Sequence, residues 1–216
     1  MNYLKKFKDI LIESIKENKK LIIIFAILFI VLFIATWICA IGPISSKIET
    51  LTNATQQESI NNTNVDPLAI FINNVYGGLI VYVTSIFFGI GGIISLIYNA
   101  INLGAIGALF SVMMPDGGLR YILYLIPHGI FEITATILEP VSGIILFRFV
   151  WRFLKGITRS NEKGFKKISS PFKNNQQILI QSLVLFTFTT ILLLIAAPIE
   201  SYISVPFSEL ILGKPN

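Results

Sequence analysis

The chain has 216 residues, of which 54% are hydrophobic and 13% charged, with a mean hydropathy of +0.74 and a formal net charge of +5. This composition excludes a water-soluble globular protein and indicates an integral membrane protein. The length fits one integral membrane domain, residues 1–216, and is too short for a bundle plus a second folded module.

Residues 1–20 are basic and are predicted to form a cytoplasmic amphipathic helix on the inner leaflet, because apolar residues recur there at near-helical spacing. A continuous extension of the following span is the alternative. Residues 21–41 contain no charge over roughly the 20 residues that a helix needs to cross a bilayer, and they predict the first span. Its apolar run is longer than that of a secretory signal and lacks a good cleavage site, so we expect a retained anchor. The apolar residues before this span are Leu4, Phe7, Ile10, Leu11 and Ile15.

A polar external loop is predicted at residues 42–67, because the segment is rich in Asn, Thr, Ser and Gln. Residues 68–114 follow as an apolar segment long enough for two helical crossings, the second and third spans. The turn between them is expected near residues 89–92, where glycines allow a sharp reversal. A re-entrant hairpin is the alternative for this segment, and it would leave the sidedness of the flanking segments unchanged.

Two further apolar segments, residues 119–150 and 178–199, predict the fourth and fifth spans. They flank a basic cytoplasmic loop at residues 151–177, and an external tail follows at residues 200–216. The fold class predicted by these segments is all-α: a polytopic membrane bundle of about five transmembrane helices.

Fourteen of the seventeen basic residues lie in two segments, residues 1–20 and 148–173. Four predicted spans separate these segments, so both lie on one side of the membrane, and the positive-inside rule makes that side the cytoplasm. We therefore expect a multi-pass protein of the cell membrane with a cytoplasmic N-terminus and an external C-terminus. The basic face is expected to attract anionic lipid. Nucleic-acid binding is not expected, because no aromatic interleaving accompanies the basic residues.

Three ionisable residues, His128, Glu132 and Glu139, interrupt the fourth span at spacings that place them on one face of a helix. A carboxylate at the bilayer centre costs about 2.5–3.5 kcal/mol on insertion scales, so this face is expected to point toward protein or water. Asparagines of the second and third spans are expected to join this polar centre through interhelical hydrogen bonds. They are Asn73, Asn74, Asn99 and Asn102.

Three uses remain open for the polar centre. It could form a structural hydrogen-bond network from His128 to Glu132 and on to the asparagines of the third span. It could instead relay protons or ions. Metal catalysis is the third use, but the chain has one histidine and therefore lacks the second histidine of HExxH. Neither a metal nor a cofactor is expected, and the lone Cys39 provides no internal disulfide.

The motif PHGIFE at residues 127–132, the pair Asn73-Asn74 and the stretch NAINLGAIGALF at residues 99–110 resemble the stage II sporulation protein M family. The resemblance covers residues 15–205 and departs from the family at Ala100, where a glycine is usual, which puts close packing there in doubt. It implies an integral membrane protein with no established enzymatic activity. In spore-formers it implies a septal-membrane scaffold in a complex with two peptidoglycan-degrading partners during engulfment. Relatives in organisms that do not sporulate imply a broader membrane role.

We therefore expect a non-enzymatic scaffold or membrane-remodelling protein that acts in a complex with protein partners, with a homo-oligomer as one form of that complex. A small transporter or channel-like protein that uses the His and Glu side chains is the alternative. An intramembrane hydrolase is the third class that the polar centre leaves open.

Overall fold

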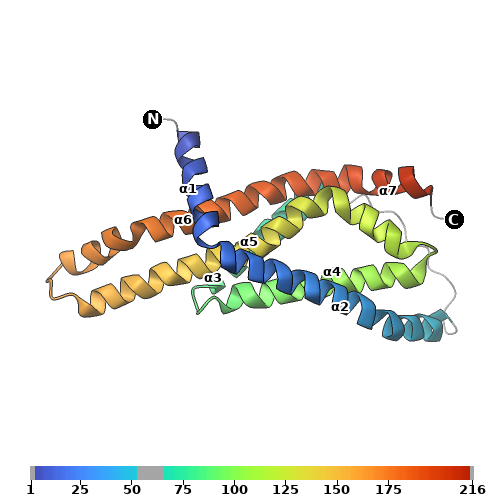
Figure 1. The fold of residues 1–216 in the computed structure, drawn as a ribbon, viewed down its shortest axis with the longest axis horizontal. Helices are drawn as coiled ribbons and strands as arrows, with labels where there is room; N and C mark the ends of the chain where they lie inside the picture. The colour runs from blue at the N-terminus through green and yellow to red at the C-terminus, as the bar shows by residue number, and fades with distance from the viewer. Residues whose placement is uncertain (1–2, 53–65, 215–216) are drawn as a thin grey trace.

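The computed structural model describes residues 3–52 and 66–214, and within these residues helices follow one another with short connections and no strand (Figure 1). The prediction of an all-α bundle is confirmed. The helices are α1 (Tyr3–Glu17), α2 (Lys19–Thr52), α3 (Pro67–Thr84), α4 (Ile90–Met113), α5 (Gly117–Arg159), α6 (Lys166–Ile199), the π-helix η1 (Glu200–Ser204) and α7 (Val205–Leu212).

Five of the described segments are helical, long and apolar enough to cross a membrane, as the sequence predicts. They are α2, α3, α4, α5 and the continuous segment of α6, η1 and α7. α3 has 18 residues and α4 has 24, so at 1.5 Å per residue they are about 27 Å and 36 Å long. Two helices of this length favour two crossings over a re-entrant hairpin of irregular backbone.

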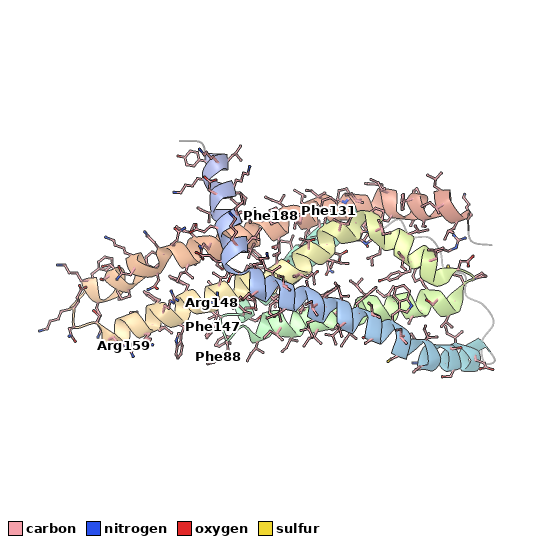
Figure 2. All side chains as sticks on the ribbon, viewed as in Figure 1. Phe88, Phe131, Phe147, Arg148, Arg159 and Phe188 are labelled. Carbon is pink, nitrogen blue, oxygen red and sulfur yellow. The ribbon has the colours of Figure 1, made fainter. Side chains whose placement is uncertain are left out.

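The chain reverses between α3 and α4 at residues 85–89, slightly before the predicted glycines. Phe88 and Gly89 adopt positive φ values of 58° and 72° there. Glycine suits this position doubly, because a Cβ at Gly89 would also lie 2.7 Å from Ile144 Cγ1 on α5. The Phe88 ring lies 5.3 Å from that of Phe147, so the reversal packs against α5 (Figure 2).

α1 is a separate helix that crosses the bundle at Asn18, where the chain changes direction before α2 (Figure 1). Two hydrogen bonds fix this crossing: Arg148 Nη1 donates to Asn18 Oδ1 at 2.8 Å, and Gln181 Nε2 donates to Glu17 Oε2 at 3.1 Å. The structure thus favours the amphipathic helix over a straight extension of the first span.

α5 and α6 form a long antiparallel hairpin whose closed end extends beyond α1 (Figure 1). The predicted loop at residues 151–177 is largely helical, and only residues 160–165 connect the two helices. We call residues 149–180 the basic arm. Figure 2 places Arg148 at its base and Arg159 near its tip.

Two other predicted non-helical segments are helical in part. α2 continues through Pro43 to Thr52, although a proline inside a helix removes one backbone hydrogen bond. The rest of the predicted external loop, residues 53–65, lies outside the described residues. The predicted tail, 200–216, contains η1 and α7.

Close packing of α4 against α2 uses the glycines of the third span. A Cβ at Gly104 would lie 2.5 Å from the Phe33 carbonyl oxygen, and one at Gly107 would lie 2.6 Å from Trp37 Cε3. Helices in lipid associate through such small residues because lipid removes the hydrophobic driving force between them. Ala100 is fully buried, so the departure from the family's glycine does not prevent close packing there.

Candidate functional site

His128 lies on α5 and is buried, with 2% of its surface exposed. Its Nδ1 lies 2.8 Å from Ser204 Oγ of η1, and its Nε2 lies 3.7 Å from Glu132 Oε2 one turn along α5. The Glu132 side chain is 26% exposed. The stripe predicted on the fourth span therefore faces the protein interior, where burial of a charge requires a partner.

η1 brings two side chains from the end of the chain to this histidine. Pro198 lacks a backbone donor and directly precedes the change from α6 to the wider π-helix. Ser204 Oγ donates to the Ile199 carbonyl at 3.2 Å, across the five-residue spacing of a π-turn. Glu200 precedes Ser204 by four residues and accepts a hydrogen bond at Oε1 from the Tyr124 hydroxyl at 3.2 Å.

His128, Glu132 and Glu200 each offer one possible ligand atom, and these three atoms lie within 4.8 Å of one another. We call these residues the His–Glu–Glu cluster. The Tyr124 ring packs edge-on against the His128 ring, with centroids 5.1 Å apart. The cluster joins α5 to η1 inside the spans.

α7 holds η1 in place from the other end. Arg120, near the start of α5, donates to the carbonyl oxygens of Gly213 at 2.7 Å and Leu212 at 3.2 Å. These are the free carbonyls at the C-terminus of α7, which a cation stabilises. The segment that contains Glu200 and Ser204 is therefore attached to α5 on both sides of the cluster.

A polar cavity of about 290 Å³ lies beside the cluster, between α3, α4, α5 and α6. Glu132 lines it and so belongs both to the cavity and to the cluster. Glu139 is buried at the cavity wall against Gly78, where an added Cβ would lie 2.9 Å from the Glu139 carboxyl carbon. The other lining residues are Asn73, Asn74, Tyr76, Gly77, Val81, Ser95, Tyr98, Asn99, Thr136 and Leu193.

The predicted asparagines separate into two groups. Asn73, Asn74 and Asn99 line the cavity, whereas Asn102 is exposed and is not among the lining residues. Asn99 Nδ2 donates to the Ser95 carbonyl at 2.9 Å within α4, so its bond is local and not interhelical. The predicted network from His128 to the third-span asparagines is replaced by the bond to Ser204.

Sequence reasoning missed Tyr124, Glu200 and Ser204. Tyr124 lies four residues before His128 on the same helical face, and this spacing was visible in the sequence. Glu200 follows the last apolar run directly and was assigned to the external tail. The π-helix that turns Glu200 inward has no signal in the sequence apart from Pro198.

Among the described residues, no Lys or Arg forms an ion pair with Glu132, Glu139 or Glu200; the ion pair recorded for them joins Glu132 to His128. Glu139 is buried, and Glu132 and Glu200 are half-buried. Carboxylates that are shielded from water and have no basic partner must be protonated, hydrogen-bonded or neutralised by a cation. The arrangement is therefore suited to binding a proton or a positive ion.

The sequence model of the family described as Stage II sporulation protein M matches residues 23–205. The chain belongs to the stage II sporulation protein M family. The matched range includes the whole His–Glu–Glu cluster and the residues that line the cavity.

One relative of this member of the stage II sporulation protein M family is a protein of Methanocaldococcus jannaschii, which is named only as an uncharacterized protein. The two chains are 32% identical over 142 residues, which cover 63% of this chain and 69% of the relative. No solved structure matches the chain.

Proposed function

We propose that this stage II sporulation protein M family member is a non-enzymatic scaffold or membrane-remodelling protein. In this proposal it recruits partner proteins to the inner face of the cell membrane. The observation that carries the proposal is the basic arm, a helical projection at one end of the membrane bundle (Figure 1). Its exposed charged residues are mostly basic.

The arm has a small aromatic core of its own. The rings of Phe149 and Phe153 are stacked with centroids 5.8 Å apart, and Phe172 of α6 packs edge-on against both. Gly156 allows close approach of the helices, because a Cβ there would lie 2.7 Å from Pro171 Cβ. Packing of this kind gives the arm a defined shape on which a partner could dock.

The charged side chains of the arm point outward. Its basic residues are exposed, and Glu162 is its single acidic residue. A surface of this charge attracts acidic protein surfaces and anionic lipid, the latter by about 1 kcal/mol for each basic residue near the bilayer. The basic residues are Arg152, Lys155, Arg159, Lys163, Lys166, Lys167 and Lys173.

The proposal includes an orientation. Both basic segments lie at one end of the bundle, since α1 contacts α6 and Asn18 bonds Arg148 at the base of the arm. The positive-inside rule favours the cytoplasm for this end. The N-terminus would then be cytoplasmic and the C-terminus external. α1 would lie along the inner leaflet, with Leu11 and Ile15 packed against the bundle.

Crosslinking in native membranes, followed by identification of the captured proteins, tests the scaffold role. The arm variant K163E/K166E/K167E reverses three exposed charges. K47E, which reverses one exposed charge near the C-terminal end of α2, away from the arm, is the control. We expect the arm variant to lose at least tenfold in capture of specific partners, with wild-type capture in K47E. Equal capture by all three proteins would contradict the proposal.

A small transporter or channel-like protein is the second candidate, and the polar cavity favours it. Glu132, Glu139 and the asparagines supply oxygen ligands inside the spans, where polar side chains often mark an ion or proton path. Proteoliposomes with a pH-sensitive dye test this role. Flux that is present in the wild type and absent in E139Q would support it, and no flux above empty liposomes would contradict it.

A further inference from the structure

We propose that the His–Glu–Glu cluster of His128, Glu132 and Glu200 binds one first-row divalent metal ion, with Zn²⁺ as the experimental probe. This site does not depend on the scaffold role of the basic arm. Three features support it: the direction in which the histidine presents its free nitrogen, the spacing of the ligand atoms, and the charge of the surroundings.

The position of Ser204 indicates which nitrogen of His128 is free. Ser204 Oγ lies 3.2 Å from the Ile199 carbonyl oxygen and 2.8 Å from His128 Nδ1, and its hydroxyl has one hydrogen for these two contacts. A carbonyl can only accept, so in the site that we propose the hydroxyl donates to Ile199 and accepts from His128, which places the imidazole proton on Nδ1. In the neutral ring, Nε2 then has a free lone pair directed toward Glu132, which is the form of histidine that binds metals.

The spacing of the cluster is too wide for direct hydrogen bonds and suits a shared ion. The Nε2 atom of His128 and Glu132 Oε2 are 3.7 Å apart, beyond the 2.7–3.2 Å range of an N–H···O bond. Zinc ligands lie about 2.0–2.2 Å from the ion, so two of them are roughly 3.3 Å apart in a tetrahedral site. The three ligand atoms lie within 4.8 Å of one another, and side-chain shifts of about 1 Å would bring them to one ion.

The surroundings of the cluster lack a positive side chain that could neutralise two carboxylates. Among the described residues, Glu132 pairs with His128 alone, and Glu200 receives a neutral hydrogen bond from Tyr124. A divalent cation would neutralise both carboxylates inside the spans, where uncompensated charge is costly. A bound divalent ion would therefore stabilise the cluster by compensating the charge of Glu132 and Glu200.

The groups behind the ligands resemble the outer contacts of known metal sites. Ser204 orients His128 through the nitrogen that does not face the ion, and Tyr124 holds one oxygen of Glu200 while leaving the other free. The polar cavity reaches Glu132 and provides room for a water ligand and a path of entry. One imidazole with two carboxylates favours Zn²⁺, Mn²⁺ or Fe²⁺ over Mg²⁺ or Ca²⁺, which prefer oxygen ligands alone.

Metal analysis of the purified full chain tests the site. The affinity tag must contain no histidine, because tag histidines would bind metal themselves. His128, the chain's single histidine, is then the one imidazole in the protein. After chelation, the detergent-solubilised protein is titrated with Zn²⁺, and bound metal is counted by mass spectrometry. We expect one Zn²⁺ per chain and an unfolding midpoint that rises with Zn²⁺ concentration.

Three variants locate the ion. We expect E200Q and H128A to weaken Zn²⁺ binding at least a hundredfold, and E162Q, an exposed carboxylate of the basic arm outside both the cluster and the cavity, to bind like the wild type. E200Q keeps the shape of the side chain, so it remains informative if H128A does not fold. Absence of stoichiometric Zn²⁺ in the wild type, or unchanged binding in E200Q, would overturn the proposal. Partner capture by the basic arm is expected to be unchanged in E200Q, which separates this result from the scaffold test.

Discussion

Ser204 Oγ lies 2.8 Å from His128 Nδ1, although the two residues are 76 positions apart in the chain. The bond attaches the π-helix η1 to the middle of α5 and determines which side of the imidazole faces the two glutamates.

Removing the Ser204 hydroxyl should destabilise the fold. In S204A the buried His128 loses its 2.8 Å hydrogen bond at Nδ1, and loss of a hydrogen-bond partner by a buried polar group costs about 1–3 kcal/mol. Thermal unfolding in detergent, followed by circular dichroism, measures the loss. S208A is the control, because the Ser208 hydroxyl donates to the Val205 carbonyl within α7. An equal effect in S204A and S208A would contradict the importance of the interhelical bond.

The protonated nitrogen of His128 can be measured directly, because the chain has one histidine. In protein labelled with ¹⁵N-histidine, the imidazole signals of the metal-free wild type should show the proton on Nδ1. S204A removes the acceptor of that proton, so we expect a mixture of the two neutral forms. A wild-type spectrum with the proton on Nε2 would contradict the direction assigned to the Ser204 bond.

Two adjacent glycines on α3 should respond differently to alanine. A Cβ at Gly78 would collide with the Glu139 carboxylate, whereas nothing lies within 4 Å of a Cβ at Gly77. Overpacking of this kind costs about 1–3 kcal/mol, so G78A should lower the unfolding midpoint. G77A should leave the midpoint unchanged or raise it slightly, because alanine favours the helix over glycine. Equal unfolding midpoints for G78A and G77A would contradict the packing of α3 against α5.

α1 should detach from the bundle when its bond to Arg148 is removed. R148A deletes the donor to Asn18 Oδ1 and should increase proteolytic cleavage within residues 3–17 several-fold in detergent. K155A removes an exposed charge two turns further along α5 and is the matched control. Cleavage that is equally fast in R148A, K155A and the wild type would show that this bond does not hold α1.

Cysteine labelling should establish the orientation in the membrane. C39S gives a cysteine-free background, because the chain has one cysteine. A membrane-impermeant maleimide should label K214C in intact cells and should label K5C and K163C only after the membrane is opened. Labelling of K5C and K163C from opposite sides would contradict the shared position of the two basic segments.

The sequence predicted the helical class, the five spans and the inward-facing stripe because these follow from length, hydropathy and spacing. The uncharged run at residues 21–41 and the spacing of His128 and Glu132 required no tertiary information. The turn between α3 and α4 was nearly correct, since Gly89 has the positive φ that a glycine allows. The break at Asn18 was one of two alternatives, and its tertiary bond to Arg148 could not be seen in the sequence.

The contacts of the polar centre were not predictable, because they depend on which helices meet. Glu200 appeared to lie in an external tail, and only the π-helix after Pro198 turns it toward Tyr124 and His128. Asn102 shares the polar character of Asn99 but faces outward, since α4 presents its glycine face to α2. The high charge of residues 151–177 predicts a loop. The contact between Phe153 and Phe172, which packs the two helices of the arm together, is a tertiary contact that the sequence does not show.

The crossing of α1 over α6 at Gln181 also limits where a bound protein can rest. From Phe149 to Arg159 the arm continues past this crossing for 11 residues, about 16 Å of helix at 1.5 Å per residue. With α1 on the inner leaflet, a globular domain that bound the arm along α6 would contact α1 before it reached the lipid headgroups. The arm would then hold the bound protein at a fixed distance from the bilayer.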